Sequence, residues 1–128
     1  MSEPRWIGAA LVPAIHERLL SEHGGTAGLR DPAALDSALA RPRSLWAYEP
    51  ATSLERLAAA YAFGLAFSRP FIDGNKRVAL VVCEVFLKDN GRTLTAPQGD
   101  KYLAMVGLAS ETIGEQEFEQ WLSNHCIR

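Results

Sequence analysis

Cysteine, long apolar runs and surplus positive charge are all scarce in this sequence of 128 residues. Its two cysteines, Cys83 and Cys126, form no Cys-x-x-Cys motif and no Cys/His pair at zinc spacing, which excludes a disulfide framework or zinc module. No apolar stretch approaches the ~18 residues of a membrane span, and no export signal is recognisable. The net charge of -2 gives no general attraction to nucleic acid or anionic membranes. We therefore expect a cytoplasmic protein that binds neither.

What the chain does contain is the composition of a folded protein. Hydrophobic residues make up 48% and charged residues 22%, which excludes a disordered or low-complexity chain. No repeat, linker or change of composition divides the sequence. We expect one domain over residues 1–128, with a core that needs no disulfide or metal.

Apolar residues recur at helical spacing through most of the chain, whereas strand-type alternation is rare. The pattern predicts an all-α, compact bundle of about six helices, at roughly 9–23, 31–41, 53–65, 75–88, 99–110 and 114–124. Helix 75–88 is apolar almost all round, so we expect it at the centre, surrounded by the others. Residues 43–51 are expected to form a loop whose aromatics, Trp46 and Tyr48, either cover a cleft or fill the core.

The candidate site is the polar, basic stretch that joins two apolar helices at residues 67–77. Gly74 permits unusual backbone angles, and the residues after it have N–H groups without partners inside the helix. These donors and the helix dipole favour an anion, and Lys76 and Arg77 add full charges beside them. We expect a phosphate ligand, with Asp73 holding the Mg²⁺ that usually accompanies a nucleotide.

A simpler interpretation is also open from local chemistry. Asp73, Gly74 and Asn75 could form an ordinary turn and helix cap, with Lys76 and Arg77 merely solvated. The longer pattern around them bears on this choice.

The stretch Arg69-Pro-Phe-Ile-Asp-Gly-Asn-Lys-Arg77 resembles the signature His-Pro-Phe-x-Asp-Gly-Asn-Lys-Arg of the Fic/Doc superfamily, in particular the death-on-curing (Doc) toxins of type II toxin–antitoxin systems. Every fixed position but the first agrees. Flanking blocks at 24–42, 47–48, 57–61 and 86–91 also resemble the family, so the similarity covers roughly residues 6–122. A signature in a helix–loop–helix context with such flanks is specific.

The resemblance implies transfer of part of a nucleoside triphosphate to a protein hydroxyl. Fic members mostly transfer AMP, whereas Doc-like toxins with lysine at the position of Lys76 phosphorylate elongation factor Tu. By the same resemblance Asp73 binds Mg²⁺, residues Gly74, Asn75, Lys76 and Arg77 clamp the phosphates of ATP, and Phe71 points inward. The implied partner is an antitoxin whose disordered segment folds into a groove on the bundle.

Arg69 departs from the family where the signature histidine accepts the proton of the attacking hydroxyl. A guanidinium stays protonated and offers only donors, so Arg69 cannot be a general base. We expect this form to be inactive, while Arg69 either strengthens ATP binding or pairs with Asp73 and blocks the metal. Both a naturally degenerate member and a deliberate inactivating change are consistent with one sequence.

The other histidines offer no substitute base at a recognisable spacing. His16 is expected in the core or at the edge of a cleft, and His23 and His125 as helix caps or exposed residues. The alternatives to an inactive Doc-type kinase are therefore a Fic-type AMP transferase and a non-catalytic module that binds a nucleotide or a partner.

Overall fold

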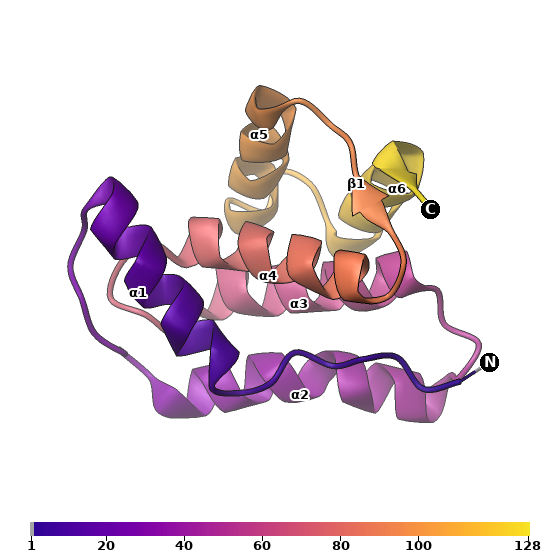
Figure 1. The fold of residues 1–128 in the computed structure, drawn as a ribbon, viewed down its shortest axis with the longest axis horizontal. Coiled ribbons are helices and arrows are strands. Elements are labelled where there is room, and N and C mark those ends of the chain that lie inside the picture. Colours follow the sequence, from indigo (N-terminus) through magenta and orange to yellow (C-terminus); the bar gives the residue numbers. More distant parts are fainter. Residues whose placement is uncertain (1) are drawn as a thin grey trace.

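The computed structural model describes residues 2–128 and contains six helices with one short pair of strands (Figure 1). The helices are α1 (Leu11–His23), α2 (Pro32–Tyr48), α3 (Leu54–Ser68), α4 (Asn75–Asp89), α5 (Gln98–Ala109) and α6 (Glu115–His125). The strands are β1 (Thr93–Leu94) and β2 (Cys126–Ile127). The predicted helical bundle is thus confirmed.

The antiparallel pairing of β1 with β2 was not expected from the sequence. Thr93 lies opposite Ile127 and Leu94 opposite Cys126. Strands of two residues are too short to produce an alternating pattern, so periodicity could not reveal them. Their role is to attach the C-terminus to the chain that leaves α4.

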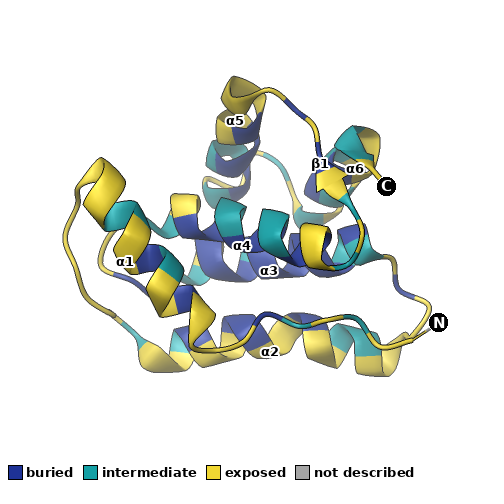
Figure 2. Ribbon diagram, in the orientation of Figure 1, coloured by how far each residue is buried: buried dark blue, intermediate teal, exposed yellow. Residues whose placement is uncertain are grey.

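The centre of the bundle is the pair α3 and α4, with α2 on one side and α5 and α6 on the other (Figure 1). Helix α3 is the more deeply buried, and Figure 2 shows it dark blue along most of its length. The expectation that the helix over 75–88 is surrounded on all sides needs correction. Leu80 and Val81 on α4 stay partly exposed, because they line a cleft.

Small residues allow α2 and α3 to approach closely. A Cβ on Gly64 would lie 3.2 Å from the Cα and the Cβ of Ala38, tighter than ordinary van der Waals contact. Glycine is therefore used here for packing and not for its backbone angles. The close approach fixes α2 against the helix that leads into the candidate loop.

The prediction that a helix ends before Pro42 and gives way to a loop over 43–51 is wrong. Helix α2 continues through Pro42 to Tyr48. Proline inside a helix costs ~3 kcal/mol. Here that cost is offset by packing, because Pro42 is buried and Trp46 packs edge-on against Trp6 at 6.1 Å. Of the two aromatics, Trp46 joins the core, whereas Tyr48 is 85% exposed.

Both cysteines are free thiols. Burial, and then the charge of Glu84, raise the pKa of Cys83 far above its usual range. Burial, and then Glu55, raise the pKa of Cys126 to about 11. Thiols that remain protonated at neutral pH are poor nucleophiles, so neither is a candidate for covalent chemistry.

Candidate functional site

The candidate loop connects α3 to α4 through two left-handed backbone positions. Arg69 ends α3 with φ +48° and ψ 62°, and Gly74 precedes α4 with φ +79° and ψ 15°. The proline at position 70 makes continuation of α3 unfavourable, since the residue before a proline avoids helical angles. Glycine at position 74 adopts the second left-handed conformation without a Cβ penalty.

Residues 28–31 form backbone hydrogen bonds with the loop. The backbone N–H groups of Arg30 and Asp31 donate to the carbonyl of Pro70, at 2.7 and 2.9 Å. The N–H of Ile72 donates to the carbonyl of Gly28 at 3.0 Å. The loop is therefore paired with a second segment of backbone along much of its length.

The side chain of Arg30 completes this support. Its Nε donates to the carbonyl of Arg69 at 2.7 Å, and its Nη2 donates to the carbonyl of Ser68 at 2.6 Å. These carbonyls belong to the end of α3, where helical acceptors lack N–H partners. Arg30 thus caps the helix from which the loop departs.

Asn75 closes the loop on itself. Its Oδ1 accepts from the N–H of Phe71 at 3.0 Å, and its Nδ2 donates to the carbonyl of Phe71 at 2.9 Å. Phe71 is 3% exposed, pointing inward as the resemblance implies. With its amide occupied in this way, the Asn75 side chain sets the shape of the loop.

Asp73 is exposed and has both carboxylate oxygens near backbone amides. Oδ1 accepts from the N–H of Gly74 at 2.9 Å, and Oδ2 accepts from the N–H of Thr26 at 3.2 Å. Carboxylate oxygens retain further lone pairs for a hard cation. Within residues 2–128 no group of three or more metal-binding side chains gathers here, so Mg²⁺ would depend on Asp73 together with phosphate oxygens.

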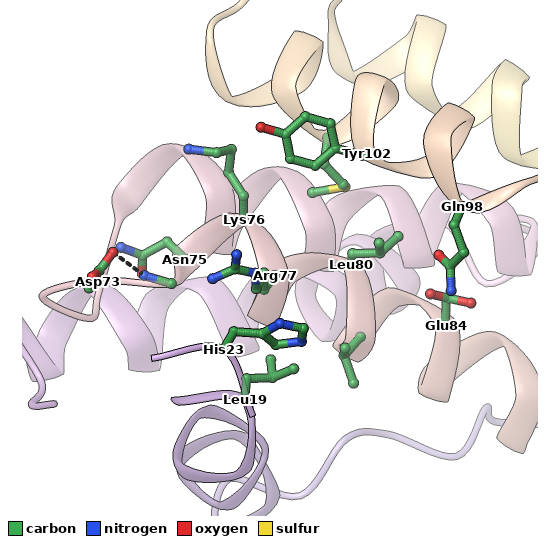
Figure 3. Close-up of a pocket in the computed structure, with 13 residues that line it drawn as sticks. Leu19, His23, Asp73, Asn75, Lys76, Arg77, Leu80, Glu84, Gln98 and Tyr102 are labelled. Carbon is green, nitrogen blue, oxygen red and sulfur yellow. Dashed lines mark hydrogen bonds between the residues drawn. The ribbon is translucent and has the colours of Figure 1, made fainter. Parts of the chain in front are cut away.

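A cleft of about 490 Å³ opens at the start of α4 (Figure 3). Lys76 and Arg77 are exposed on the first turn of α4 and line it together with Asp73 and Asn75. Among residues 2–128, no side chain caps this end of α4. The N–H groups of residues 75–77 lie where a helix provides no acceptor, so charge and free donors meet at one place.

The rest of the cleft comes from elements that the sequence did not connect with the loop. α1 supplies Leu19 and His23, α5 supplies Tyr102, and Figure 3 shows Tyr102 beside Lys76 with His23 and Leu19 across from it. The remaining lining residues are Gly74, Leu80, Val81, Glu84, Gln98 and Met105. No local signal marks these side chains, because only the packing of α1 and α5 beside α4 brings them together.

Arg69 does not line this cleft. It borders a second, more open one of about 490 Å³, with Arg30, Phe67, Ser68, Phe71 and Ile72. Asn75 lines both clefts, so the two adjoin at this residue. The alternative that Arg69 pairs with Asp73 receives no support, since the ion pairs of the described chain include none between them.

The three histidines have different environments. His16 is 5% exposed and its Nε2 lies 2.8 Å from the carbonyl oxygen of Asp73, which confirms the expected core position. His23 is exposed at the end of α1. His125 is half-buried, with Nδ1 2.8 Å from the carbonyl of Trp121. Only His16 and His23 approach the loop or its cleft.

Comparison with known proteins agrees with this geometry. The family model described as the Fic/DOC family matches residues 6–87, and the signature loop lies inside that match. A curated relative, "Protein kinase doc" of Escherichia phage P1, is 36% identical over 78 residues. That alignment spans 61% of this chain and 62% of the relative, less than two thirds of its length.

No helix within residues 2–128 combines the length and hydropathy needed to cross a bilayer. The family model covers well over half of the chain: α1 to α3, the loop and all but the last two residues of α4, whereas the α5 side chains that complete the first cleft lie beyond it. The protein therefore belongs to the Fic/DOC family.

Proposed function

We propose that the protein is a Doc-type toxin whose site is built to transfer the γ-phosphate of ATP to a hydroxyl of a translation factor, elongation factor Tu by resemblance. The observation that carries this proposal is the cleft at the start of α4. There Lys76, Arg77 and uncapped helix amides surround a space suited to polyphosphate. The phage relative is named a protein kinase, which supports the kinase branch.

The fit of ATP with Mg²⁺ rests on the donor set. Backbone amides and two cations suit phosphate oxygens, and the exposed carboxylate of Asp73 lies next to them. Bound there, Mg²⁺ would neutralise charge that develops on the phosphates during transfer. The chain's own task is to align the terminal phosphate with the acceptor oxygen.

Proton acceptance is the step that this form lacks. As the phosphoryl group moves to the acceptor oxygen and ADP leaves, the hydroxyl proton needs a base. Arg69 borders the second cleft, which shares Asn75 with the first, and its guanidinium cannot take that proton. We infer that the acceptor enters from the second cleft and that the chain with Arg69 is inactive.

The partner that would restrain an active form is an antitoxin with a disordered segment. Beyond its charged end, the first cleft is lined by Leu80, Val81, Tyr102 and Met105. An amphipathic segment that folds on binding would bury these side chains and close access to Lys76. Inhibition would then follow from occupation of the cleft.

Position 76 is the basis for choosing phosphorylation over AMP transfer. Relatives that transfer AMP usually carry glycine there, which leaves room along the helix for the α- and β-phosphates. The long cationic side chain of Lys76 occupies that space and adds charge. We therefore propose that the γ-phosphate is the group presented to the acceptor.

The test uses Arg69→His, with Arg69→Gln as a matched control that removes the charge without adding a base. Each variant is incubated with elongation factor Tu and ATP labelled at either end, and is expressed without antitoxin. We expect γ-label on the acceptor and growth arrest for Arg69→His only. Transfer of α-label would assign AMP transfer instead. A folded Arg69→His variant that transfers neither label contradicts the proposal.

Arg69 itself favours a second candidate, a module that binds a nucleotide or a partner without catalysis. In that case ATP would bind to the wild-type chain, but Arg69→His would transfer nothing. Calorimetric titration with ATP, combined with the labelling experiment, separates the two functions.

A further inference from the structure

A buried histidine of α1, His16, packs against the candidate loop. His16 is 5% exposed, and its Nε2 lies 2.8 Å from the carbonyl oxygen of Asp73. Its ring stacks on Phe71, with ring centroids 3.9 Å apart and an interplanar angle of 13°. A Cβ on Gly74 would lie 3.8 Å from both Cδ2 and Nε2 of this ring. His16 therefore contacts the loop at Asp73 and Phe71 and lies beside Gly74.

The hydrogen bond indicates which nitrogen of the His16 ring carries the hydrogen. A carbonyl oxygen only accepts, so Nε2 of His16 must carry the hydrogen, and in the neutral ring Nδ1 then carries none. His16 thus acts on the loop in two ways. Its Nε2–H donates to the carbonyl of Asp73, and the flat face of its ring stacks on Phe71.

The contact has a geometric consequence for Asp73. No cis peptide bond occurs in the described chain, so the Asp73–Gly74 peptide is trans and its C=O and N–H point in opposite directions. The carbonyl is directed to His16, and the Gly74 N–H is thereby directed to Asp73 Oδ1, which it holds at 2.9 Å. The orientation of the carboxylate is thus coupled to the imidazole on the opposite side of the peptide.

We propose that His16 is a positioning residue: by holding the Asp73 carbonyl it orients the Asp73 carboxylate and the first free amides of α4 toward Mg²⁺ and phosphate. The binding part of this inference rests on the proposed function. The orientation of the peptide does not, and can be measured without a ligand.

Two variants separate the donor from the ring. His16→Phe keeps a flat ring against Phe71 but removes the donor, whereas His16→Gln keeps an N–H donor and removes the ring. We expect ATP binding in the presence of Mg²⁺ to weaken roughly tenfold in His16→Phe and to stay within roughly threefold of wild type in His16→Gln, since one hydrogen bond is at stake.

Urea unfolding of the same variants provides the control. A merely structural role predicts that affinity follows stability, so that the apolar, stacking His16→Phe retains the better binding. That order would overturn the proposal, and rescue of affinity by His16→Gln supports it.

Nuclear magnetic resonance tests the orientation directly. In wild type at alkaline pH we expect the Nε2–H tautomer of His16, and in His16→Phe faster hydrogen exchange of the Gly74 amide. An Nδ1–H tautomer, or an unchanged exchange rate, would overturn the proposal even if ATP binds. Absence of ATP binding in wild type would instead contradict the proposed function, and the tautomer and exchange rate would still decide the role of His16.

Discussion

The two clefts that meet at Asn75 differ in what they require from the sequence. In the first cleft, the features suited to an anion come from the start of a helix, a glycine conformation and two neighbouring cations. In the second cleft, the proposed chemistry depends on the single side chain at position 69. The proposed binding is thus distributed over many atoms, whereas the proposed proton transfer depends on one side chain.

Under the proposed function, this difference allows the site to keep its shape without its reaction. Arg69 stands where the signature that the loop resembles has histidine, and none of the hydrogen bonds that hold the loop involves the Arg69 side chain. The experiments below measure how far the two clefts are independent.

The largest effect is expected at position 69. Arg69→His should raise the rate of phosphoryl transfer by about 10² to 10⁴, the usual contribution of a general base. Affinity for ATP should change little, because position 69 lies outside the first cleft. Single-turnover kinetics and calorimetry measure the two quantities separately. A large change in ATP affinity without a gain in the rate of phosphoryl transfer would show that the two clefts are not independent.

A smaller effect is expected from Lys76→Ala. Loss of one charge-assisted hydrogen bond should weaken ATP binding about 10- to 100-fold. Stability should be unaffected because Lys76 is exposed. Lys88→Ala is the matched control, since Lys88 is an exposed lysine in the last turn of the same helix. Equal affinities of the two variants would place the anion elsewhere.

The last effect is on stability and is expected from Asn75→Ala, which should disturb both clefts. Two hydrogen bonds to Phe71 disappear, at about 1 kcal/mol each. Urea unfolding should report a loss of about 2 kcal/mol. Asn124→Ala, which removes one exposed contact with Gln120, is the control and should change stability by less than about 0.5 kcal/mol. Comparable losses in the two variants would argue that Asn75 does not hold the loop.

Local sequence patterns predicted most of the helices, since apolar spacing and caps are local. Asp31 caps α2 and Ser53 caps α3. Their side-chain oxygens accept hydrogen bonds from the backbone N–H groups of Ala34 and Arg56, three residues further along. Pro42 misled the prediction because its cost is local, whereas the compensating contact between Trp46 and Trp6 joins distant segments.

The candidate site was predictable to a similar extent. The charges and glycine of the loop are contiguous in the sequence, so the anion cleft could be anticipated. That Arg69 and Lys76 line different clefts could not be anticipated, because residues so close in sequence were expected to face one space. The contact of His16 with Asp73 likewise spans 57 positions. In the sequence, the only indication of this contact is that His16 lies among apolar residues on the helix over 9–23.

The left-handed backbone at Arg69 has a consequence for how this protein can change over generations. Its φ of +48° is a conformation in which histidine is several-fold enriched among non-glycine residues. The conformation is maintained by Arg30, through the carbonyls of Ser68 and Arg69, and not by the residue 69 side chain. Under the proposed function, one substitution at position 69 would therefore remove or restore the reaction without disturbing the fold. The fold constrains the backbone of residue 69, whereas the proposed reaction depends on its side chain.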